Sequence, residues 1–295
     1  MTLEQLRIFV AVAEREHVTR AAKALNLTQS ATSAAIAALE QRHGTRLFER
    51  VGRGINLTEA GRLFLPEARA VLARAAAAEQ LLEDLGTLTR GSLRLAASQT
   101  LANYWLPPLM LAFHRAHPGV TLDLTIGNTE QVAAEVQAMR ADLGFVEGVV
   151  DAPALEQAVI GGDEMFLVVA PSHPWASVRP GAAALEAGTW VLREPGSGTR
   201  ALMEAALRAQ GIAPERLADR IELTSNEAVR AAVGAGGGAT ILSRLVVEAS
   251  LAAGELVRLP FPPLPRDFRL LRHRDRYETR AARAFSALAK EPSPS

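Results

Sequence analysis

The chain of 295 residues contains no cysteine, which excludes a disulfide framework, thiolate metal ligands and thiol catalysis. Lysine occurs only at Lys23 and Lys290, so arginine carries nearly all of the positive charge. The 32 basic and 32 acidic side chains cancel to a net charge of zero. This balance argues against a histone-like coat for nucleic acid, although it leaves room for a basic surface on one domain.

The sequence also lacks a long apolar run, since none approaches the roughly 20 residues that a membrane span needs. Met1 leads directly into a helix-forming stretch, without a basic-then-apolar signal region. We therefore expect a cytoplasmic protein. At roughly 150 residues per domain, the length suggests about two domains, which are large enough to bury cores without staples.

The first segment predicts a cluster of helices. Residues 3–42 contain no proline and carry apolar side chains at helical spacing. Asn26 interrupts the pattern, and Thr28 is a candidate N-cap for the helix that follows. We expect three short helices, the second and third joined by a turn at 25–28.

A hairpin and a long helix are predicted next. Residues 47–57 read as two short strands around a glycine-rich turn. A helical pattern then runs from Thr58 to about Thr89, roughly 48 Å at 1.5 Å per residue. We expect a connector and dimerisation arm, bent or restarted at Pro66. Its seam-like apolar positions are Leu81, Leu85 and Leu88.

Beyond a linker at 90–92, strands and helices alternate, which indicates an α/β body. Strands are expected at 93–97, 121–126, 143–146, 166–170, 221–223, 240–242 and 268–271. Helices are expected at 107–117, 130–141, 199–210, 226–234, 244–253 and 276–289. The tail at 291–295 is expected to be disordered.

The turn between the second and third helices is the strongest functional signal. A helix-turn-helix places its second helix in the major groove of DNA, where residues near the N-terminus of that helix meet base edges. Short polar side chains occupy those positions, namely Thr28, Gln29, Ser30, Thr32 and Ser33. We expect them to face DNA, while Ala31, Ala35 and Ile36 face inward.

Gln29 can pair with an adenine edge, and hydroxyl groups can pair with several bases. Arg50 and Arg53 on the hairpin could reach phosphates or a minor groove as a wing. A plain helical bundle with a polar face has the same spacing, so the spacing alone leaves both interpretations open.

Several stretches of the head together are similar to a known family: 9–14, 19–22, 25–33, Ile36, 39–40, Gly44, 47–50 and 57–61. They resemble the DNA-binding head of the LysR-type transcriptional regulators, nearly continuously over the first 65 residues. Length and domain order fit over the whole chain. The resemblance implies DNA contacts at Thr19, Thr28, Gln29, Ser30, Thr32, Ser33, Arg50 and Arg53.

The resemblance also implies a multidomain α and α/β fold: a winged helix-turn-helix at 1–60, a linker helix at 58–89 that pairs two subunits, and an effector-binding domain at 90–295. That domain would have two lobes, like type 2 periplasmic binding proteins. One departure is that many members carry an arginine directly after the residue equivalent to Ser33, where this chain has Ala34. Recognition of the DNA sequence would then depend more on DNA shape and on four residues, Gln29, Ser30, Arg50 and Arg53.

Three hydroxyl-bearing or glycine-rich turns open helices in the body, at 98–100, 127–129 and 195–200. Helix N-termini offer free backbone N–H groups and a positive dipole end, which suit an anion. In an open α/β sheet such turns gather at the carboxyl ends of the strands. Ordinary N-capping is the alternative, although three such turns favour a site.

Residues 127–130, 143–148 and 193–200 resemble the regulators of sulfur assimilation and of Calvin-cycle carbon fixation. This resemblance implies a small anionic effector such as sulfite, sulfate or a phosphorylated metabolite. It would line the cleft with Ser98, Thr100, Thr129, Ser197 and Thr199, and its edge with Asn128, Glu147, Arg200 and Asn226. Gln99 of the first turn is a further candidate for effector binding. Glu147 suits an anion site only if it holds a donor in place.

Other patterns predict no chemistry. The glycine-rich segment 234–239 matches a dinucleotide fingerprint, but a helix precedes it and a strand follows, the reverse of the required order. His114 and His117 lack a third metal ligand, and Ser197 lacks a nucleophile elbow and a base. We therefore expect no metal, no cofactor and no catalytic set.

We expect a cytoplasmic homotetrameric regulator in which one lobe comprises 90–162 with 265–295 and the other 163–264, with hinges near Gly162 and Pro265. A bound anion would favour one arrangement of the lobes, and this would change the bend of a partly palindromic promoter site. The changed bend would then alter the access of RNA polymerase. A solute-binding protein and an α/β enzyme are the rival interpretations. The first lacks a signal peptide, and the second lacks a base or nucleophile.

Overall fold

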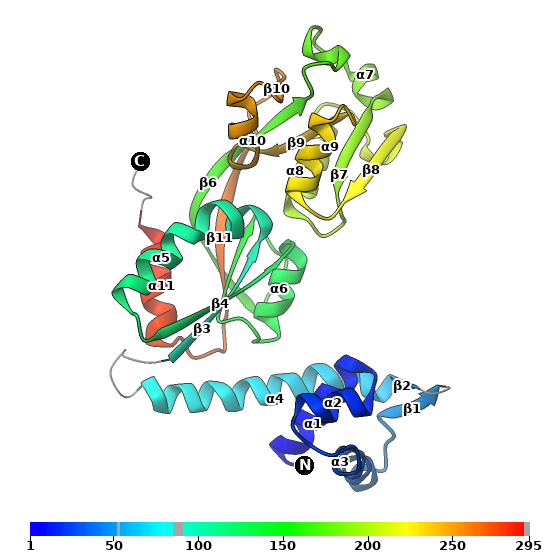
Figure 1. The fold of residues 1–295 in the computed structure, drawn as a ribbon, viewed down its shortest axis with the longest axis vertical. Helices are drawn as coiled ribbons and strands as arrows, with labels where there is room; N and C mark the ends of the chain where they lie inside the picture. The colour runs from blue at the N-terminus through cyan, green and yellow to red at the C-terminus, as the bar shows by residue number, and fades with distance from the viewer. Residues whose placement is uncertain (52–53, 85–90, 292–295) are drawn as a thin grey trace. The chain divides into compact units, whose positions relative to one another are not determined.

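The computed structural model describes residues 1–51, 54–84 and 91–291, and the chain divides into two compact units, Met1–Leu85 and Gly86–Ser295. Figure 1 shows the helical first unit in blue to cyan and the α/β second unit in green to red. Within the described residues, no helix is long and apolar enough to cross a membrane.

Four helices and a hairpin form the first unit. They are α1 (Leu3–Arg15), α2 (Val18–Ala24), α3 (Gln29–His43), β1 (Phe48–Val51), β2 (Gly54–Leu57) and α4 (Glu59–Asp84). Thr2 and Gln5 form a capping box on α1, and the Thr28 hydroxyl accepts from the Ala31 N–H to cap α3. The tight turn before α3 uses Asn26 at φ 55°, a left-handed conformation that asparagine tolerates.

The core of the first unit gathers around Phe9, which is fully buried and packs its ring 5.4 Å from Phe48 and 5.0 Å from Phe64. These contacts join α1 to the hairpin and to the start of α4. A side chain at Gly61 would lie 2.1 Å from the carbonyl oxygen of Leu47, so only glycine lets α4 start this close to the hairpin.

The helix α4 continues through Pro66. The expected restart at this proline is therefore wrong, because proline removes one N–H but the turns on both sides supply the remaining helical bonds. The side chain of Leu81 and residues Leu85 and Leu88 lie outside the described part of the chain, so their seam stays a prediction.

The second unit holds one extended sheet in the order β4-β3-β5-β11-β6-β9-β7-β8, with β10 paired to β6. Its strands are β3 (Gly91–Ser98), β4 (Val120–Gly127), β5 (Leu143–Glu147), β6 (Leu155–Val169), β7 (Thr189–Arg193), β8 (Asp219–Leu223), β9 (Ala239–Ser243), β10 (Val257–Arg258) and β11 (Pro265–His273). Its α-helices are α5 (Leu106–Ala116), α6 (Thr129–Gln137), α7 (Ala182–Ala187), α8 (Gly198–Ala209), α9 (Asn226–Gly234), α10 (Arg244–Ala252) and α11 (Arg280–Lys290).

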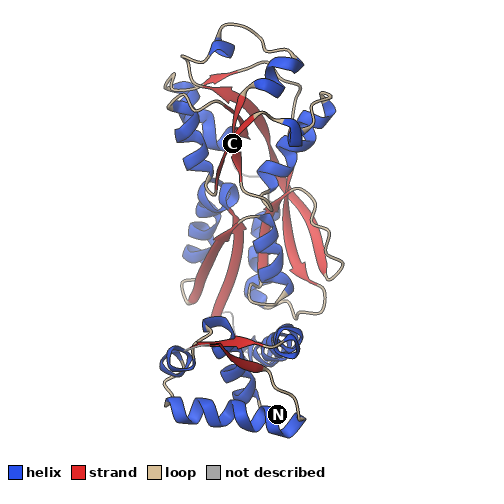
Figure 2. Ribbon diagram, turned by 90° about the vertical axis from the view of Figure 1, so that its right-hand side faces the viewer, coloured by secondary structure: helices blue, strands red, loops and turns tan. Residues whose placement is uncertain are grey.

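The long strand β6 belongs to both halves of this sheet. Residues 155–164 pair with β11, and residues 165–169 pair with β9. The sheet thus divides into two lobes where the chain crosses at β6 and β11. Helices flank the strands in both halves (Figure 2). In the first lobe, α5 and α11 pack on one face and α6 on the other; in the second, α8 lies opposite α9 and α10.

Several elements differ from the sequence expectations. The predicted helix 130–141 ends at Gln137, because Met139 adopts a left-handed φ of 56°. The predicted helix 276–289 begins at Arg280 behind the N-cap Thr279. The expected strand 166–170 is the second half of β6, and the buried strand β7 was not predicted.

Candidate functional site

The N-terminus of α3 presents a polar face in the first unit. Thr28, Gln29, Ser30 and Ser33 are all exposed there. The Thr19 hydroxyl on α2 donates to Oε1 of Gln29 at 3.2 Å, and this contact orients the amide. The expected exposure of these four positions is present in the structure, and Thr19 contacts one of them, Gln29.

The expected orientation of Thr32 is wrong. Thr32 is fully buried, and its hydroxyl donates to the carbonyl oxygen of Thr28 at 3.0 Å, whereas Ala31 is exposed. The helical back-bond lets the small hydroxyl sit in the core without an unsatisfied group. Thr32 therefore cannot offer its hydroxyl to a base edge in this structure.

The hairpin follows α3 and forms one wall of a groove whose other wall is α3 itself. Arg50 on β1 is exposed and lines this groove together with Gln29 and Ser33. Arg53 lies outside the described residues. The groove combines the polar N-terminus of α3 with the exposed Arg50, and Glu16, Glu40 and Glu49 line it as well. Arginine and short polar side chains are the groups that contact phosphates and base edges in protein–DNA complexes.

Glu40 on α3 fixes the hairpin to the helix, and the sequence reasoning missed it. Its Oε1 accepts from the backbone N–H groups of Leu47 at 2.7 Å and Phe48 at 3.0 Å. Both donors belong to buried residues. A single carboxylate thus sets the position of the strand that carries Arg50.

A narrow polar cavity lies between the two lobes of the second unit, and in this arrangement of the lobes it has no room for a water molecule. The lining side chains come from the strand ends and helix starts of both lobes. They are Ser98, Gln99, Asn128, Thr129 and Glu147 from the first lobe and Arg193, Ser197, Gly198, Thr199 and Asn226 from the second. Eight of the ten predicted effector residues therefore meet here.

The remaining two lie elsewhere. The Thr100 hydroxyl accepts from Nδ2 of Asn226 at 3.1 Å without lining the cavity. Arg200 lines the larger pocket next to this cavity, and its guanidinium binds Glu204 at 2.8 Å and Glu222 at 2.6 Å. Asn128, Glu147 and Asn226, expected at the edge, are 7%, 3% and 1% exposed and line the interior instead, because lobe closure buries the strand ends.

Hydrogen bonds hold the lobes together on the side of α9. Gln99 donates to the Thr224 carbonyl at 2.7 Å and accepts from the Asn226 N–H at 2.9 Å. Further out, the Tyr104 hydroxyl donates to Glu227 at 3.2 Å. Burial and the charge of Glu227 raise the pKa of Tyr104, so this phenol remains a donor.

Asn128 and two glycines close the side of α8. Nδ2 of Asn128 donates to Glu194 at 3.2 Å across the lobes. A Cβ at Gly196 would lie 2.5 Å from the Glu130 carboxylate, and one at Gly198 would lie 2.6 Å from Oγ1 of Thr129. Closure at this distance therefore depends on glycine at both positions.

Arg193 and Arg266 are the buried cations of the site, and sequence reasoning missed both as site residues. Arg193 makes two hydrogen bonds with Glu194, at 2.8 and 2.9 Å, and also donates to Asn226. Burial alone would raise the pKa of Glu194, but hydrogen bonds from Arg193, its own backbone and Asn128 hold that pKa below its ordinary value. Arginine at the end of a buried strand was the available signal.

Arg266 on β11 is fully buried at the crossing between the lobes. Its Nε and Nη2 bind the Asp163 carboxylate, and its Nη1 donates to the Thr199 hydroxyl at 3.4 Å. Nη1 also lies 3.6 Å from Oε1 of Glu147. One guanidinium thereby connects both lobes, the crossing strand β6 and the cavity.

Two hydroxyl groups at the cavity have no hydrogen-bond partner among the described residues, Ser98 Oγ and Thr129 Oγ1. Both atoms are buried. A buried unpaired hydroxyl costs free energy, so such groups mark places where a ligand or water completes the hydrogen bonding.

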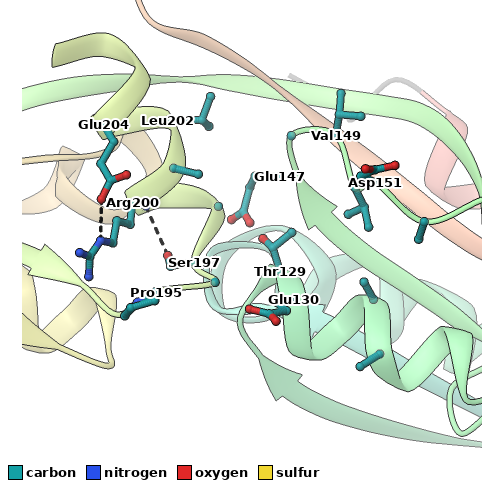
Figure 3. Close-up of a pocket in the computed structure, with 18 of the residues that line it drawn as sticks. Thr129, Glu130, Glu147, Val149, Asp151, Pro195, Ser197, Arg200, Leu202 and Glu204 are labelled. Atoms are coloured by element: carbon teal, nitrogen blue, oxygen red, sulfur yellow. Dashed lines mark hydrogen bonds and ion pairs between the residues drawn. The ribbon is translucent and has the colours of Figure 1, made fainter. Parts of the chain in front are cut away.

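A larger pocket lies outside the cavity and shares Thr129, Glu147 and Ser197 with it. Figure 3 shows these three side chains pointing toward the space between α6 and α8, and it shows Arg200, which also lines this pocket, bound to Glu204. The outer pocket forms the approach to the inner cavity from this side.

Within the described residues, no group of three or more histidine, aspartate or glutamate side chains could hold a metal ion. His114 is exposed, and His117 packs its ring 4.7 Å from Phe113. The glycine-rich segment 234–239 lies between α9 and β9, so a helix precedes it and a strand follows. That order does not fit a dinucleotide site.

Two family models match the chain. Residues 3–62 match the bacterial regulatory helix-turn-helix protein, lysR family, and residues 86–292 match the LysR substrate binding domain. The uncharacterized regulator YeiE of Escherichia coli K12 is 36% identical over 293 residues, 97% of this chain and 96% of that protein. The RuBisCO operon transcriptional regulator of Allochromatium vinosum is 37% identical, over 97% of this chain and 94% of that protein.

Solved structures share the fold. CbnR in complex with its target DNA aligns with a TM-score of 0.67 at 24% identity, covering 98% of this chain and 99% of that one. The regulatory domain of Synechocystis PCC6803 CcmR in complex with 2-PG aligns with a TM-score of 0.61 at 24% identity, covering 70% of this chain and all of that one. The relatives are transcriptional regulators, which removes the solute-binding and enzyme interpretations.

Proposed function

The chain belongs to the LysR family of DNA-binding transcriptional regulators, and we propose that a small anion bound between the lobes of its effector domain controls how it binds or bends promoter DNA. The observation that carries this proposal is the closed polar cavity, which both lobes line and in which Ser98 and Thr129 have unpaired hydroxyl groups.

The chemistry around the cavity favours an oxyanion. The N-termini of α6 and α8 open at its wall, with Asn128 and Ser197 as their N-caps. Backbone N–H groups and the two unpaired hydroxyl groups can donate hydrogen bonds to an anion, and the positive ends of the helix dipoles favour its charge. Arg193 adds a guanidinium at the cavity wall. Sulfite, sulfate and phosphorylated metabolites are the candidate effectors.

Binding of the effector between the lobes would couple its presence to the arrangement of the DNA-binding heads. A ligand that contacts both lobes binds the closed arrangement more tightly than an open one, so it shifts the population toward closure. In a symmetric assembly that shift changes the spacing or angle of the paired DNA-binding heads. The DNA-contacting residues of each head would be Gln29, Ser30 and Ser33 on α3 with Arg50 on the hairpin, supported by Thr19 and Thr28, and Arg53 at the hairpin turn.

We further propose the functional division and assembly that the sequence suggested. The head at 1–60 reads DNA, the helix at 58–89 pairs the subunits, and the domain at 90–295 binds the effector. The protomers form a homotetramer on a partly palindromic site in the cytoplasm, where a changed bend alters access of RNA polymerase.

Fluorescence anisotropy tests this function. Full-length protein is titrated into labelled intergenic DNA from beside its own gene and into a scrambled control at one salt concentration. A preference of about a thousandfold or more is expected for the operator. Phosphate, sulfite and sulfate are then added, and DNA bending is followed by energy transfer between end labels. An affinity and a bend that no anion changes would contradict the anionic effector.

A further inference from the structure

The carboxylate of Glu147 is the unusual member of the effector cavity. Its side chain is 2% exposed and extends from the end of β5 toward Thr129 and Ser197 (Figure 3). An anion site ordinarily excludes carboxylates, because two like charges at short range repel each other strongly where water is absent.

The neighbouring cations do not neutralise this group fully. Arg193 donates two hydrogen bonds to Glu194, and Arg266 donates two to Asp163. Two arginines thus face three carboxylates, and Glu147 is the one without a close pair. Its Oε1 forms an ion pair with Nη1 of Arg266 at 3.6 Å, a longer distance than the hydrogen bonds that Arg193 makes with Glu194.

A buried carboxylate in this position needs a hydrogen-bond donor. Ser98 Oγ and Thr129 Oγ1, which lie in the same cavity, have no hydrogen-bond partner among the described residues and can donate to a ligand oxygen. The cavity therefore offers several donors and one acceptor. A ligand that fits must present acceptor oxygens and also one donor of its own.

We infer that Glu147 selects an oxyanion that still carries a proton, such as hydrogen phosphate, a phosphate monoester monoanion or bisulfite, and rejects sulfate. The ligand O–H donates to Glu147, while its other oxygens accept from Ser98, Thr129 and Arg193. Sulfate holds no proton near neutral pH, so it would place two unscreened negative charges together. This inference rests on the proposed function, because it concerns the same cavity.

Calorimetric titration of the full-length protein with inorganic phosphate and with sulfate, at pH 7 and matched ionic strength, tests the inference. Phosphate should bind at least about a hundredfold more tightly than sulfate, since a site built around a ligand hydroxyl rejects the analogue that lacks it. In Glu147→Gln the amide can donate to sulfate, so the preference should fall below about tenfold. Glu248→Gln, which changes an exposed glutamate of α10 that lines neither the cavity nor the outer pocket, is the matched control and should keep the preference.

Each outcome has a separate meaning. Equal affinities for the two anions in the unmodified protein would overturn selection by protonation and leave an anionic effector standing. No binding of either anion would overturn the anionic effector as well. A preference that survives in Glu147→Gln, with DNA binding retained as proof of folding, would remove Glu147 from the selection.

Discussion

At the residue scale, the recognition surface depends on a few exposed groups at the start of α3. Gln29 is held by the Thr19 hydroxyl, so its amide is oriented before DNA arrives. An oriented amide loses less side-chain entropy on binding, which makes it the strongest candidate for direct base readout in the head.

Replacing Gln29 with Ala should relax base preference at one position of the operator, at a cost of about 1–3 kcal/mol for the preferred base. Sequence selection from a random DNA pool measures this directly. Gln41→Ala, further along α3 and also exposed, is the control. An unchanged selected-site profile for Gln29→Ala would show that this amide reads no base.

Arg50→Ala should weaken binding to every DNA sequence by a similar factor, because phosphate contacts carry no sequence information. The slope of log affinity against log salt should fall by about one unit. Anisotropy at a series of salt concentrations gives the slope. Arg115→Ala, an exposed arginine of the other unit, should leave it unchanged, and an equal slope in Arg50→Ala would exclude a phosphate contact.

At the scale of elements, the hairpin is positioned by the helix before it. Glu40 binds the N–H groups of Leu47 and Phe48, and Gly61 lets α4 pack under the Leu47 carbonyl. The first residues of the hairpin are therefore held against α3 and α4. Because Arg50 lies on the same strand, these contacts also determine the position of Arg50.

Glu40→Ala should leave two buried N–H groups without an acceptor, at a cost of about 1–3 kcal/mol each to the local structure. Amide hydrogen exchange over 45–51 should then speed up, and affinity for all DNA sequences should fall. Glu67→Ala, an exposed glutamate of α4, serves as the control. Exchange rates that match the unmodified protein would mean that the hairpin is anchored by other contacts.

At the scale of the whole molecule, control depends on two lobes that close on each other. The long strand β6 and the antiparallel β11 connect them, and Arg266 binds groups from both sides of the crossing. The chain closes on glycine at 196 and 198, where a larger residue would hold the lobes apart.

Gly198→Ala should lower the affinity for phosphate about tenfold or more while leaving operator affinity without ligand unchanged. The added Cβ would lie 2.6 Å from Oγ1 of Thr129 and 2.9 Å from the Glu147 carbonyl, so the lobes cannot close fully. Calorimetry and anisotropy measure the two affinities. Gly181→Ala, where a Cβ meets nothing within 4 Å, is the control; unchanged phosphate affinity in Gly198→Ala would contradict closure around the ligand.

The sequence by itself determined what local physics controls. Spacing and capping predicted the helices of the head and the N-cap Thr28, because a cap depends on residues within one turn of it. The alternation of strands and helices predicted the α/β body. The polar turns together with the family resemblance predicted eight of the residues that line the cavity. The family resemblance added the order of the domains.

The tertiary structure alone decided the rest. Thr32 is buried and Ala31 is exposed, because the packing of the neighbouring helices determines which face of α3 is covered. The strand β7, the full length of β6 and the arginines Arg193 and Arg266 depend on partners far away in the chain. The spacing of apolar residues in the sequence shows which residues share one face of a helix or strand. Contacts with distant parts of the chain determine whether that face is buried or exposed to solvent.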